Sequence, residues 1–492
     1  MPPIETDHLK QKFANGRFLE IINASKDWNT PDPVTTNILA SAFAGLGAFE
    51  QAIQNLAKLV THEPDYIAAK HNLALTYLRA DQPQKASALF KEIIEKEPNF
   101  LEAQHGLAAS LAQTGKLTDA SKIQKQLCEA DPQNIPYQKN LSEFLAALGD
   151  WEAVDQILDR IIASDPTDAD ALIMRASSLL HKQRYADAQA VLRNAKDLDP
   201  DNPTLYRCLG QLWFALQDYK KAIDATLLGL QRSPSDADAY AFLGYCFLQT
   251  GQKQNAKQAL RSALKYRPAH AEAQHFLNVL ENNQDVAAEE HYVKNLFNSY
   301  ATRFEQSLVD ELGYNLPNEI PNLLQREMGT ALSDAKILDM GCGTGLVGSN
   351  LASKVAAIDG FDLSERMVDL AKEKSVYRSL SVASIDEYLS KKIDAYDVFI
   401  AADVFVYLGD LTSTFKALRN SAKKNALFLF STEEFDGAGY TARTSGRYAH
   451  SHDYIENLAT ASGFKVIHQE TVGLRREGHA VLAGGVYILR TT

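Results

Sequence analysis

Seven prolines stand at one constant interval in the first part of this 492-residue chain. A column of small residues keeps the same interval, as does a column of leucines that only Arg175 interrupts. Such a period predicts a repeat array, because each short unit buries its apolar face only by stacking on the next. The prolines are Pro64, Pro98, Pro132, Pro166, Pro200, Pro234 and Pro268; the small column is Ala52, Ala86, Ala120, Val154, Ala188, Ala222 and Ala256; the leucines are Leu39, Leu73, Leu107, Leu141, Leu209 and Leu243.

A third column holds large side chains four positions after the leucines. Small residues where helices touch, large ones four positions along, and a proline ending each second helix resemble the tetratricopeptide (TPR) repeat, whose period is about 34 residues. The resemblance implies an all-α solenoid over residues 1–282 with about eight repeats, seven of them in register from 33 to 270. A shortened repeat is expected at 9–32 and a capping helix at 271–282. The third column is Phe43, Tyr77, Leu111, Leu145, Leu179, Trp213 and Phe247.

A TPR solenoid has a concave surface on which a polypeptide partner can bind. The sixth position of the repeats carries no regular row of asparagines, so this surface departs from grooves that grip a peptide backbone. The fifth position is mildly cationic, and we hypothesise that it accepts an acidic or polar polypeptide. A solvated helix face is the alternative, and assembly into oligomers through the repeats is also open. The fifth-position residues are Asn37, His71, His105, Lys139, Ile173, Arg207 and Ala241.

The second part of the chain contains a glycine-rich turn between a predicted strand and a predicted helix. The apolar run 335–338 leads to Asp339 and then to Gly341, Gly343 and Gly345, after which a helix is predicted. Strand, glycine turn and helix begin an open α/β sheet, in which cofactors bind at the strand ends. Glycines let the backbone approach a ligand closely, and the helix N-terminus supplies unpaired N–H groups.

A second acid stands at the end of the next predicted strand, 355–362. The distance along the chain from Asp339 to Asp362 is near the spacing at which an acid meets ribose hydroxyls, about 20 residues after the turn. Ser364 is expected to cap the following helix, with Met367 on its first turn. Asp359 competes for the ribose contact, although its simpler interpretation is a solvated turn residue.

Two kinds of cofactor fit this turn. Gly343-Thr-Gly345-Leu-Val-Gly348 matches the dinucleotide pattern G-x-G-x-x-G, which keeps a nicotinamide or flavin open. Against it, Asp339 stands where a dinucleotide-binding strand ends in an apolar residue, and the match falls late, inside the helix. The acid within D-x-G-x-G-x-G resembles class I S-adenosylmethionine (SAM) methyltransferases, whose cofactor carries an ammonium group and a sulfonium near which a carboxylate is useful.

Strands and helices alternate over the rest of the chain. This alternation predicts a mostly parallel, doubly wound Rossmann-like sheet over residues 335–492, after linker and lid helices at 283–334. The resemblance implies that the last strand runs antiparallel. Further strands are expected at 380–385, 397–403, 426–431, 465–470 and 481–489, with helices near 346–351, 364–374, 411–423 and 452–462.

The methyltransferase resemblance implies a cofactor site at the strand ends, covered by the segment Tyr300-Ala-Thr-Arg303-Phe304. At the third strand the family commonly has an Ala-Asp pair whose acid faces the adenine. Here Ala383-Ser384 takes that place, so the contact falls to Ser384 or to the backbone of Ile385. The residues expected to bind SAM are Tyr300, Arg303, Asp339, Gly341, Cys342, Gly343, Asp362, Leu363, Ser364, Met367, Ser384, Ile385, Ala402 and Asp403.

Methyl transfer itself is expected near the exit of the fourth strand and near a late segment. Asp403 and Tyr407 follow that strand, and His450 lies in Arg-Tyr-Ala-His-Ser at 447–451, which we expect to be a loop and a helix start. These three are the candidate catalytic residues, with His450 or Asp403 as a general base if the acceptor is protonated. The segments 401–410 and 447–451 closely resemble a bacterial family of predicted methyltransferases with N-terminal TPR repeats, and the resemblance covers essentially the whole chain.

Composition narrows the function classes. The net charge is −12, neither half of the chain is basic, and nucleic acid is therefore a poor partner. No signal-peptide core and no apolar run long enough to span a bilayer occurs, so we expect a cytoplasmic protein without membrane contact. The four cysteines have no metal-binding spacing, so free thiols and no metal site are expected.

The sequence thus predicts a SAM-dependent methyltransferase with a TPR array for substrate docking or assembly. Its acceptor is a protein, a peptide or a small molecule. Two alternatives remain: a TPR scaffold whose second domain binds SAM without catalysis, and a nicotinamide-dependent oxidoreductase, which Asp339 disfavours.

Overall fold

The computed structural model describes residues 6–26, 28, 31–281, 286–301, 304–305, 308, 312–391, 395–477 and 480–492. The chain divides into two compact units, Met1–Ser178 and Leu179–Thr492. The first unit holds helical repeats, and the second holds the remaining repeats together with an α/β sheet. The domain boundaries expected from the sequence, after residues 282 and 334, stay predictions.

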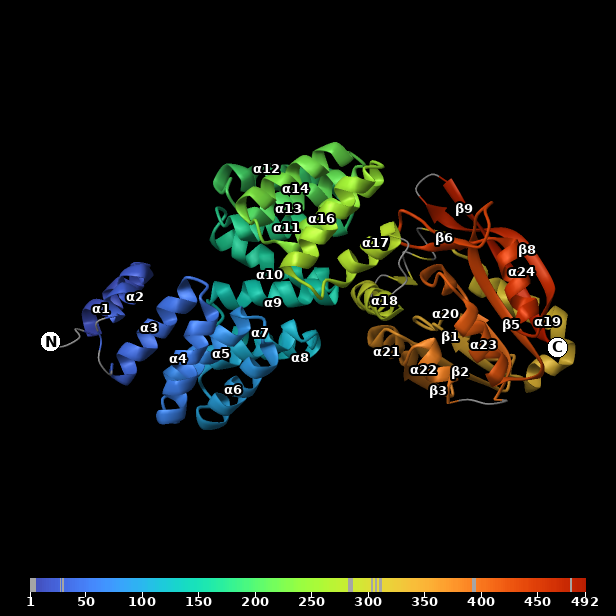
Figure 1. Ribbon diagram of the computed structural model, residues 1–492, viewed down its shortest axis with the longest axis horizontal. Coiled ribbons are helices and arrows are strands. Elements are labelled where there is room, and N and C mark those ends of the chain that lie inside the picture. The colour runs from blue at the N-terminus through green and yellow to red at the C-terminus, as the bar shows by residue number, and fades with distance from the viewer. Residues whose placement is uncertain are drawn as a thin grey trace. The chain divides into compact units, whose positions relative to one another are not determined.

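The first helices of the repeats begin at one constant interval, and so do the second helices, as the spacing of the prolines predicted (Figure 1). Every residue of the small column is fully buried, because each lies where its helix packs on a neighbour. Asp32, Asn134, Asn202 and Asp236 cap first helices with their side chains. The helices are α1 Thr6–Ala14, α2 Phe18–Ser25, α3 Pro33–Gly45, α4 Phe49–His62, α5 Ile67–Arg79, α6 Pro83–Lys96, α7 Leu101–Gln113, α8 Leu117–Ala130, α9 Ile135–Leu148, α10 Trp151–Ser164, α11 Ala169–His181, α12 Tyr185–Leu198, α13 Pro203–Ala215, α14 Tyr219–Arg232, α15 Ala237–Gln249, α16 Lys253–Tyr266 and α17 Ala271–Glu281.

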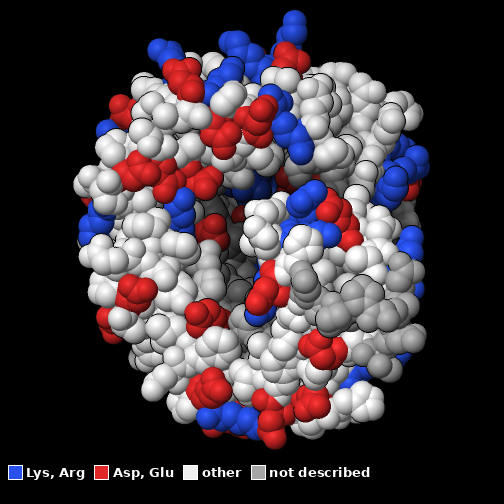
Figure 2. All heavy atoms as spheres, turned by 90° about the vertical axis from the view of Figure 1, so that its left-hand side faces the viewer, with Lys and Arg blue, Asp and Glu red and all other residues white. Residues whose placement is uncertain are grey.

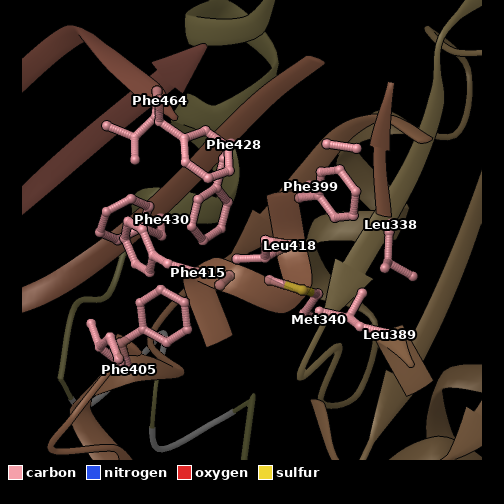
Figure 3. Close-up of a cluster of buried hydrophobic side chains, with 14 of the residues drawn as sticks. Leu338, Met340, Leu389, Phe399, Phe405, Phe415, Leu418, Phe428, Phe430 and Phe464 are labelled. Atoms are coloured by element: carbon pink, nitrogen blue, oxygen red, sulfur yellow. The ribbon is translucent and has the colours of Figure 1, made fainter. Parts of the chain in front are cut away.

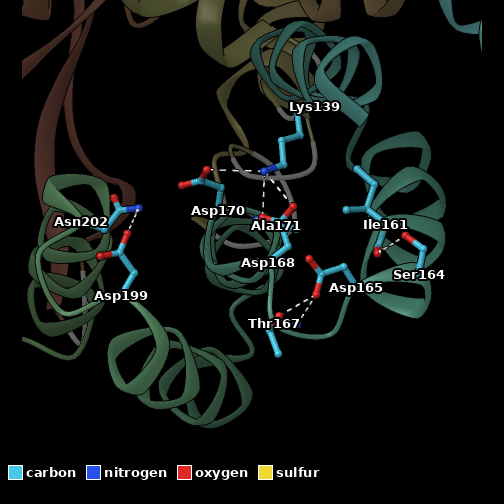
Figure 4. A network of polar contacts seen from close by, with 10 residues as sticks. All are labelled: Lys139, Ile161, Ser164, Asp165, Thr167, Asp168, Asp170, Ala171, Asp199 and Asn202. Carbon is cyan, nitrogen blue, oxygen red and sulfur yellow. Dashed lines mark hydrogen bonds and ion pairs between the residues drawn. The ribbon is translucent and has the colours of Figure 1, made fainter. Parts of the chain in front are cut away.

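The fifth-position row of the repeats is largely occupied by contacts within the array. Lys139 forms ion pairs with Asp168 and Asp170 at 2.8 and 3.5 Å (Figure 4). His105 contacts the amide oxygen of Gln124 at 3.0 Å and the amide nitrogen of Asn140 at 2.9 Å. The row therefore links neighbouring repeats. Acidic side chains are spread between basic ones over the face shown in Figure 2.

The described residues of the second unit form a nine-stranded sheet with the path β3-β2-β1-β4-β5-β7-β6. Strands β1 to β5 are parallel, and β9 joins β5 antiparallel, as the resemblance implied. Strand β8 pairs antiparallel with β9. The strands are β1 Lys336–Met340, β2 Ala357–Asp362, β3 Ser379–Val382, β4 Tyr396–Ala401, β5 Ala422–Glu434, β6 Tyr440–Ala442, β7 Tyr448–His450, β8 Phe464–Glu477 and β9 Ala480–Thr491.

Helices cover both faces of this sheet, over two separate apolar clusters. One cluster is rich in phenylalanine, including Phe405, Phe415, Phe428 and Phe430 (Figure 3). The other includes Ile320 and Leu324 of α19, so this helix, predicted within the linker segment, packs on the sheet. The helices are α18 Val286–Tyr300, α19 Leu316–Met328, α20 Leu346–Leu351, α21 Glu365–Glu373, α22 Ile385–Leu389, α23 Thr412–Ser421 and α24 His452–Ala461, with 3-10 turns η3 Gly329–Asp334 and η4 Phe405–Tyr407.

Two predictions of local structure were wrong. The third strand was expected to run to residue 385, but β3 ends at Val382, and Ser384 caps α22 through its hydroxyl. A cap residue followed by an apolar one looks like a strand end when the sequence is read alone. The segment 447–451 was expected to be a loop and helix start, but Tyr448–His450 pairs with β5 as strand β7.

Candidate active site

The glycine turn after β1 has a backbone that side chains rarely tolerate. Gly341, Gly343 and Gly345 have φ angles of +64°, +53° and +89°. A Cβ at Gly341 would come within 2.6 Å of Val404 Cγ2, so the turn packs directly against the segment after β4. The amide of Gly343 donates to Asp362 Oδ2 at 2.9 Å. The turn is therefore held between the ends of β2 and β4.

Tyr377 explains the later glycines, and the sequence analysis did not single it out. A Cβ at Gly348 or at Gly360 would meet its ring at 2.4 or 2.9 Å. Its hydroxyl accepts from the Gly348 amide at 3.2 Å and donates to Asp339 Oδ2 at 2.6 Å. Gly348 thus makes room for a tyrosine ring, which removes the reason to interpret G-x-G-x-x-G as a dinucleotide site.

The two acids of β2 have different surroundings. Asp362 lines the cavity, and its Oδ1 accepts from the Ser364 amide at 2.9 Å. Burial raises the pKa of Asp362 above its ordinary value. The expectation that Asp359 is a solvated turn residue was wrong, because its buried carboxylate pairs with Arg378 and accepts from Tyr396 Oη at 2.8 Å. Asp359 therefore stabilises the sheet and does not reach the cavity.

One cavity of about 690 Å³ joins the turn to the ends of the parallel strands. Its walls combine the glycine turn, the exits of β2, β3 and β4, and helix α18. Of the predicted residues, it brings together Gly341, Cys342, Gly343, Asp362, Leu363, Ser384, Ile385, Ala402, Asp403 and Tyr407.

Three predicted cofactor residues lie outside the cavity. Asp339 is 1% exposed, lies beneath the turn and is held by Tyr377, and burial raises its pKa to about 7. Ser364 is buried and caps α21 by accepting from the amide of Met367 at 3.2 Å, and Met367 is itself buried. The three side chains are buried outside the cavity and stabilise the segments that line it. Arg303 and the side chain of Tyr300 lie outside the described residues.

Helix α18 contributes an acid near the third strand. Glu290 lines the cavity, as does Ser384, which partly offsets the effect of burial on the pKa of the Glu290 carboxyl. Burial raises the pKa of Glu290 above its ordinary value. A carboxyl group is therefore present where the family's Ala-Asp pair is missing, but it comes from a helix far away in the sequence.

Asp403 occupies a strained position at the exit of β4. Its φ angle is +59°, a conformation uncommon outside glycine and often found at functional sites. Its amide donates to Ser431 Oγ at 3.0 Å, and its carboxylate pairs with Arg475. Tyr407, four residues later, contacts Phe297 of α18 edge to face at 5.3 Å. Burial raises the pKa of Tyr407 to about 12, so its hydroxyl keeps its proton near neutral pH.

A buried ion cluster that the sequence analysis missed supports Asp403. Arg475 of β8 is 3% exposed and pairs with Asp403 and with Glu433, which is fully buried. Arg443 and Arg447 place their Nε atoms 3.0 and 2.9 Å from the carboxylate of Glu433. Burial opposes the charge of Arg475, but the two acids beside it hold its pKa above the ordinary value. Scattered charges without a motif carry no sequence signal for such a cluster.

His450 does not face the cavity. It is fully buried in β7, and its Nε2 lies 2.9 Å from the carbonyl oxygen of Gly409. Burial lowers the pKa of His450 to about 4, so it is neutral near pH 7. The geometry gives it the role of holding the segment after β4, and we do not carry it forward as a general base.

Two arrangements are absent from the described part of the chain. Within it, no group of three or more His, Cys, Asp and Glu side chains is arranged to hold a metal ion. None of the described helices is both long enough and apolar enough to cross a membrane.

Family models match both parts of the chain. One described as methyltransferase domain covers residues 312–469. TPR models cover 43–111, 77–141 and 237–270, and a model described as anaphase-promoting complex, cyclosome, subunit 3 covers 156–228.

Named relatives match the α/β part. The chain is 27% identical over 164 residues to a ubiquinone biosynthesis O-methyltransferase of Bordetella pertussis, covering 30% of this chain and 68% of that protein. It is 33% identical over 133 residues to a malonyl-[acyl-carrier protein] O-methyltransferase of Halalkalibacterium halodurans, covering 25% of this chain and 49% of that protein.

A solved structure resembles the repeat part. This TPR protein from Parabacteroides merdae is 16% identical with a TM-score of 0.44, covering 54% of this chain and 99% of that one.

The fold and the matches define a class I SAM-dependent methyltransferase. The chain combines this domain with an N-terminal array of TPR repeats. The residues of the cavity fit the cofactor: Gly341 and Gly343 expose the backbone of the turn to it, and the buried carboxyl of Asp362 lines the same wall. Gly341–Gly343, Asp362 and Leu363, Ser384 and Ile385 are the residues that would hold SAM.

Proposed function

We propose that this enzyme transfers a methyl group from SAM to an oxygen of a small acceptor group that enters the cavity. The continuity of one cavity from the glycine turn to Asp403 and Tyr407 carries this proposal. Its volume of about 690 Å³ lies in the range of small-molecule sites, so it admits a cofactor and a compact group but no folded protein. Transfer to oxygen is supported by the activities for which the matched relatives are named.

The acceptor part of the cavity has apolar and aromatic walls. Phe297, Leu308 and Tyr407 line it, and the ring of Phe297 lies 5.9 Å from that of Phe304, which is beside Gly343 of the turn. Such walls favour an acceptor with an apolar body and exclude water from the reacting atoms. SAM supplies a methyl carbon that its sulfonium already activates, so orientation provides most of the rate.

Two residues would act on the acceptor. Asp403 accepts the proton of the acceptor hydroxyl, and Arg475 holds that carboxylate in place. Tyr407, which keeps its proton, donates a hydrogen bond that orients the acceptor. Asp403, and not His450, is the general base in this scheme, because the imidazole of His450 contacts the carbonyl oxygen of Gly409.

The repeats would dock the polypeptide that delivers the acceptor. The name of one relative gives malonyl-[acyl-carrier protein] as its acceptor, which is a small group attached to a protein. A TPR array suits the outer contact, since such solenoids offer extended binding surfaces.

Transfer of labelled methyl groups from SAM into a cell lysate tests the proposal. We expect label in a small molecule or in a group that mild base or thioester cleavage releases from protein. Asp403→Asn should lower transfer about 10²-fold while leaving the affinity for S-adenosylhomocysteine within about twofold. Asp362→Ala should abolish both. Label on ordinary protein side chains would contradict the small acceptor, and no label with intact SAM binding would favour a scaffold.

A further inference from the structure

Helix α17, the last helix of the repeat array, contacts two segments that line the cavity. His275 of this helix is 1% exposed, and its Nε2 lies 2.8 Å from the carbonyl oxygen of Gly446. The face of the same imidazole stacks on Tyr292 of α18, with ring centres 4.0 Å apart and an angle of 5° between the planes. One side chain therefore joins helix α18 to the loop 443–447.

The contact at Gly446 leaves no room for a side chain. Its φ angle is +79°, and a Cβ there would come within 3.0 Å of both His275 Nε2 and Phe276 Cε1. The loop itself is tight, because the Gly446 amide donates to the carbonyl of Arg443 at 3.0 Å, and the Arg443 amide donates to the carbonyl of Arg447 at 2.7 Å. The position of α17 therefore sets the position of this loop.

Both joined segments reach the methyl-transfer site. Arg447 lines the cavity and is paired with Glu433, which is paired with Arg475 and so linked to Asp403. Helix α18 also lines the cavity, with Val293, Leu296 and Phe297, and the last of these contacts Tyr407. Asn298, the residue after Phe297, accepts from Ser364 Oγ at 2.7 Å.

Aromatic contacts continue from this point into the array. Phe214 of α13 lies 5.1 Å from Tyr245 of α15, measured between ring centres. Tyr245 lies 5.2 Å from Phe276, and Phe276 lies 6.1 Å from Tyr292. The last repeats are thus packed in series against the helix that covers the cavity.

We propose that His275 is a positioning residue for methyl transfer. It holds helix α18 and the loop 443–447 at a fixed distance across the acceptor end of the cavity. The repeat array is then a structural part of the active site, in addition to any docking role. This inference concerns the geometry of the cavity and does not depend on which acceptor enters it.

Hydrogen exchange of the full-length protein with bound S-adenosylhomocysteine tests the proposal. His275→Ala should accelerate exchange about tenfold in 286–298 and 440–450, the scale of one hydrogen bond and one ring contact. Exchange in β1 at 336–340 should stay unchanged. His275→Phe keeps the stacking and should release mainly the loop, whereas His275→Asn keeps a donor and should release mainly α18.

His71→Ala is the matched control, since His71 packs on Phe90 and Phe100 within the first unit at ring distances of 5.7 and 5.2 Å. It should leave 286–298 and 440–450 unchanged. Equal exchange in wild type and His275→Ala would overturn the proposal, as would acceleration throughout 336–491.

An activity readout separates positioning from folding. With a lysate fraction that accepts label, His275→Ala should raise the half-saturating amount of that fraction about tenfold and change the KM for SAM less than twofold. An unchanged half-saturation would contradict the positioning role. If wild-type enzyme transfers no label, the proposed function fails, and the exchange experiment still decides the role of His275.

Discussion

The repeat array and the active site are built from the sequence in different ways. In the array, each buried position recurs at the constant interval of the repeat and packs on the adjacent helices. In the cavity, the lining residues come from separate segments between Glu290 and Arg475. A period can be recognised from one chain, whereas contacts such as Asp403 with Arg475 join positions 72 residues apart without any pattern. A substitution in the repeat array should therefore disturb only the neighbouring helices, whereas a substitution in the cavity should also affect segments that are distant in the sequence.

The largest effect is expected from Glu433→Ala. The substitution leaves Arg475, which is 3% exposed, with one carboxylate in place of two, and breaking a buried ion pair in this way costs about 3–5 kcal/mol. The thermal midpoint of the α/β domain and the rate of methyl transfer should both fall. The control is Glu434→Ala on the same strand, which removes a more exposed contact with His452 and should cost less than about 1 kcal/mol. Equal losses of stability in Glu433→Ala and Glu434→Ala would show that the buried ion cluster contributes no more than the exposed contact.

A smaller and more local effect is expected from Ala120→Leu in the small column. Ala120 is fully buried, and extra atoms in a packed site cost about 1–3 kcal/mol. Because contacts in a solenoid are between neighbours, a part of the helical signal should melt early while the affinity for S-adenosylhomocysteine stays unchanged. Ala130→Leu at the exposed end of the same helix should change stability by less than about 0.5 kcal/mol. Loss of cofactor binding in Ala120→Leu would contradict the expectation that substitutions in the repeat array have only local effects.

The site should also carry a pH dependence of its own. Burial raises the pKa of Asp339 to about 7, so the folded state holds its proton where the unfolded state does not. Its contribution to stability is present below about pH 4 and is lost as pH rises through 7, by up to about 1.4 kcal/mol per unit. Asp339→Asn cannot ionise, so its thermal midpoint should gain on wild type between pH 5 and 7.

Asp359→Asn provides the opposite case on the neighbouring strand. Burial alone would raise the pKa of Asp359, but hydrogen bonds from Arg378, Ser379 and Tyr396 hold it below its ordinary value. Its contribution is therefore present above about pH 4 and is lost only at lower pH. The difference in thermal midpoint from wild type should stay constant between pH 5 and 8. A constant difference for Asp339→Asn over the same range would refute a raised pKa.

The sequence predicted the elements that depend on local rules. The proline period placed the repeat helices, and Gly341 of the turn and Asp362, both singled out from the sequence, line the same cavity. It failed where chemistry depends on the fold. Tyr377 explains Gly348 only once β2 and α20 are packed together, and Glu290 meets Ser384 although the two lie far apart along the chain. His450 looked like a base because its type suited the chemistry, while its direction depends on β7 pairing with β5.

The smallest effects are expected in the cationic row of the repeats, where Lys139 and Arg207 can be compared. Lys139 is 26% exposed and already pairs with Asp168 and Asp170 (Figure 4), so Lys139→Glu places three acids together and should cost about 1 kcal/mol of array stability. Arg207 is exposed, and Arg207→Glu should change stability by less than about 0.5 kcal/mol.

Partner binding should follow the reverse order. If an acidic polypeptide binds to this row, its contact falls to Arg207, because the charge of Lys139 is already neutralised by two aspartates of the next repeat. Arg207→Glu should then weaken a pull-down of the partner about threefold to fivefold, the scale of one exposed ion pair, while Lys139→Glu acts mainly on the melting of the array. If neither substitution changes the pull-down, the row serves only to join repeats, and docking must use another surface of the solenoid.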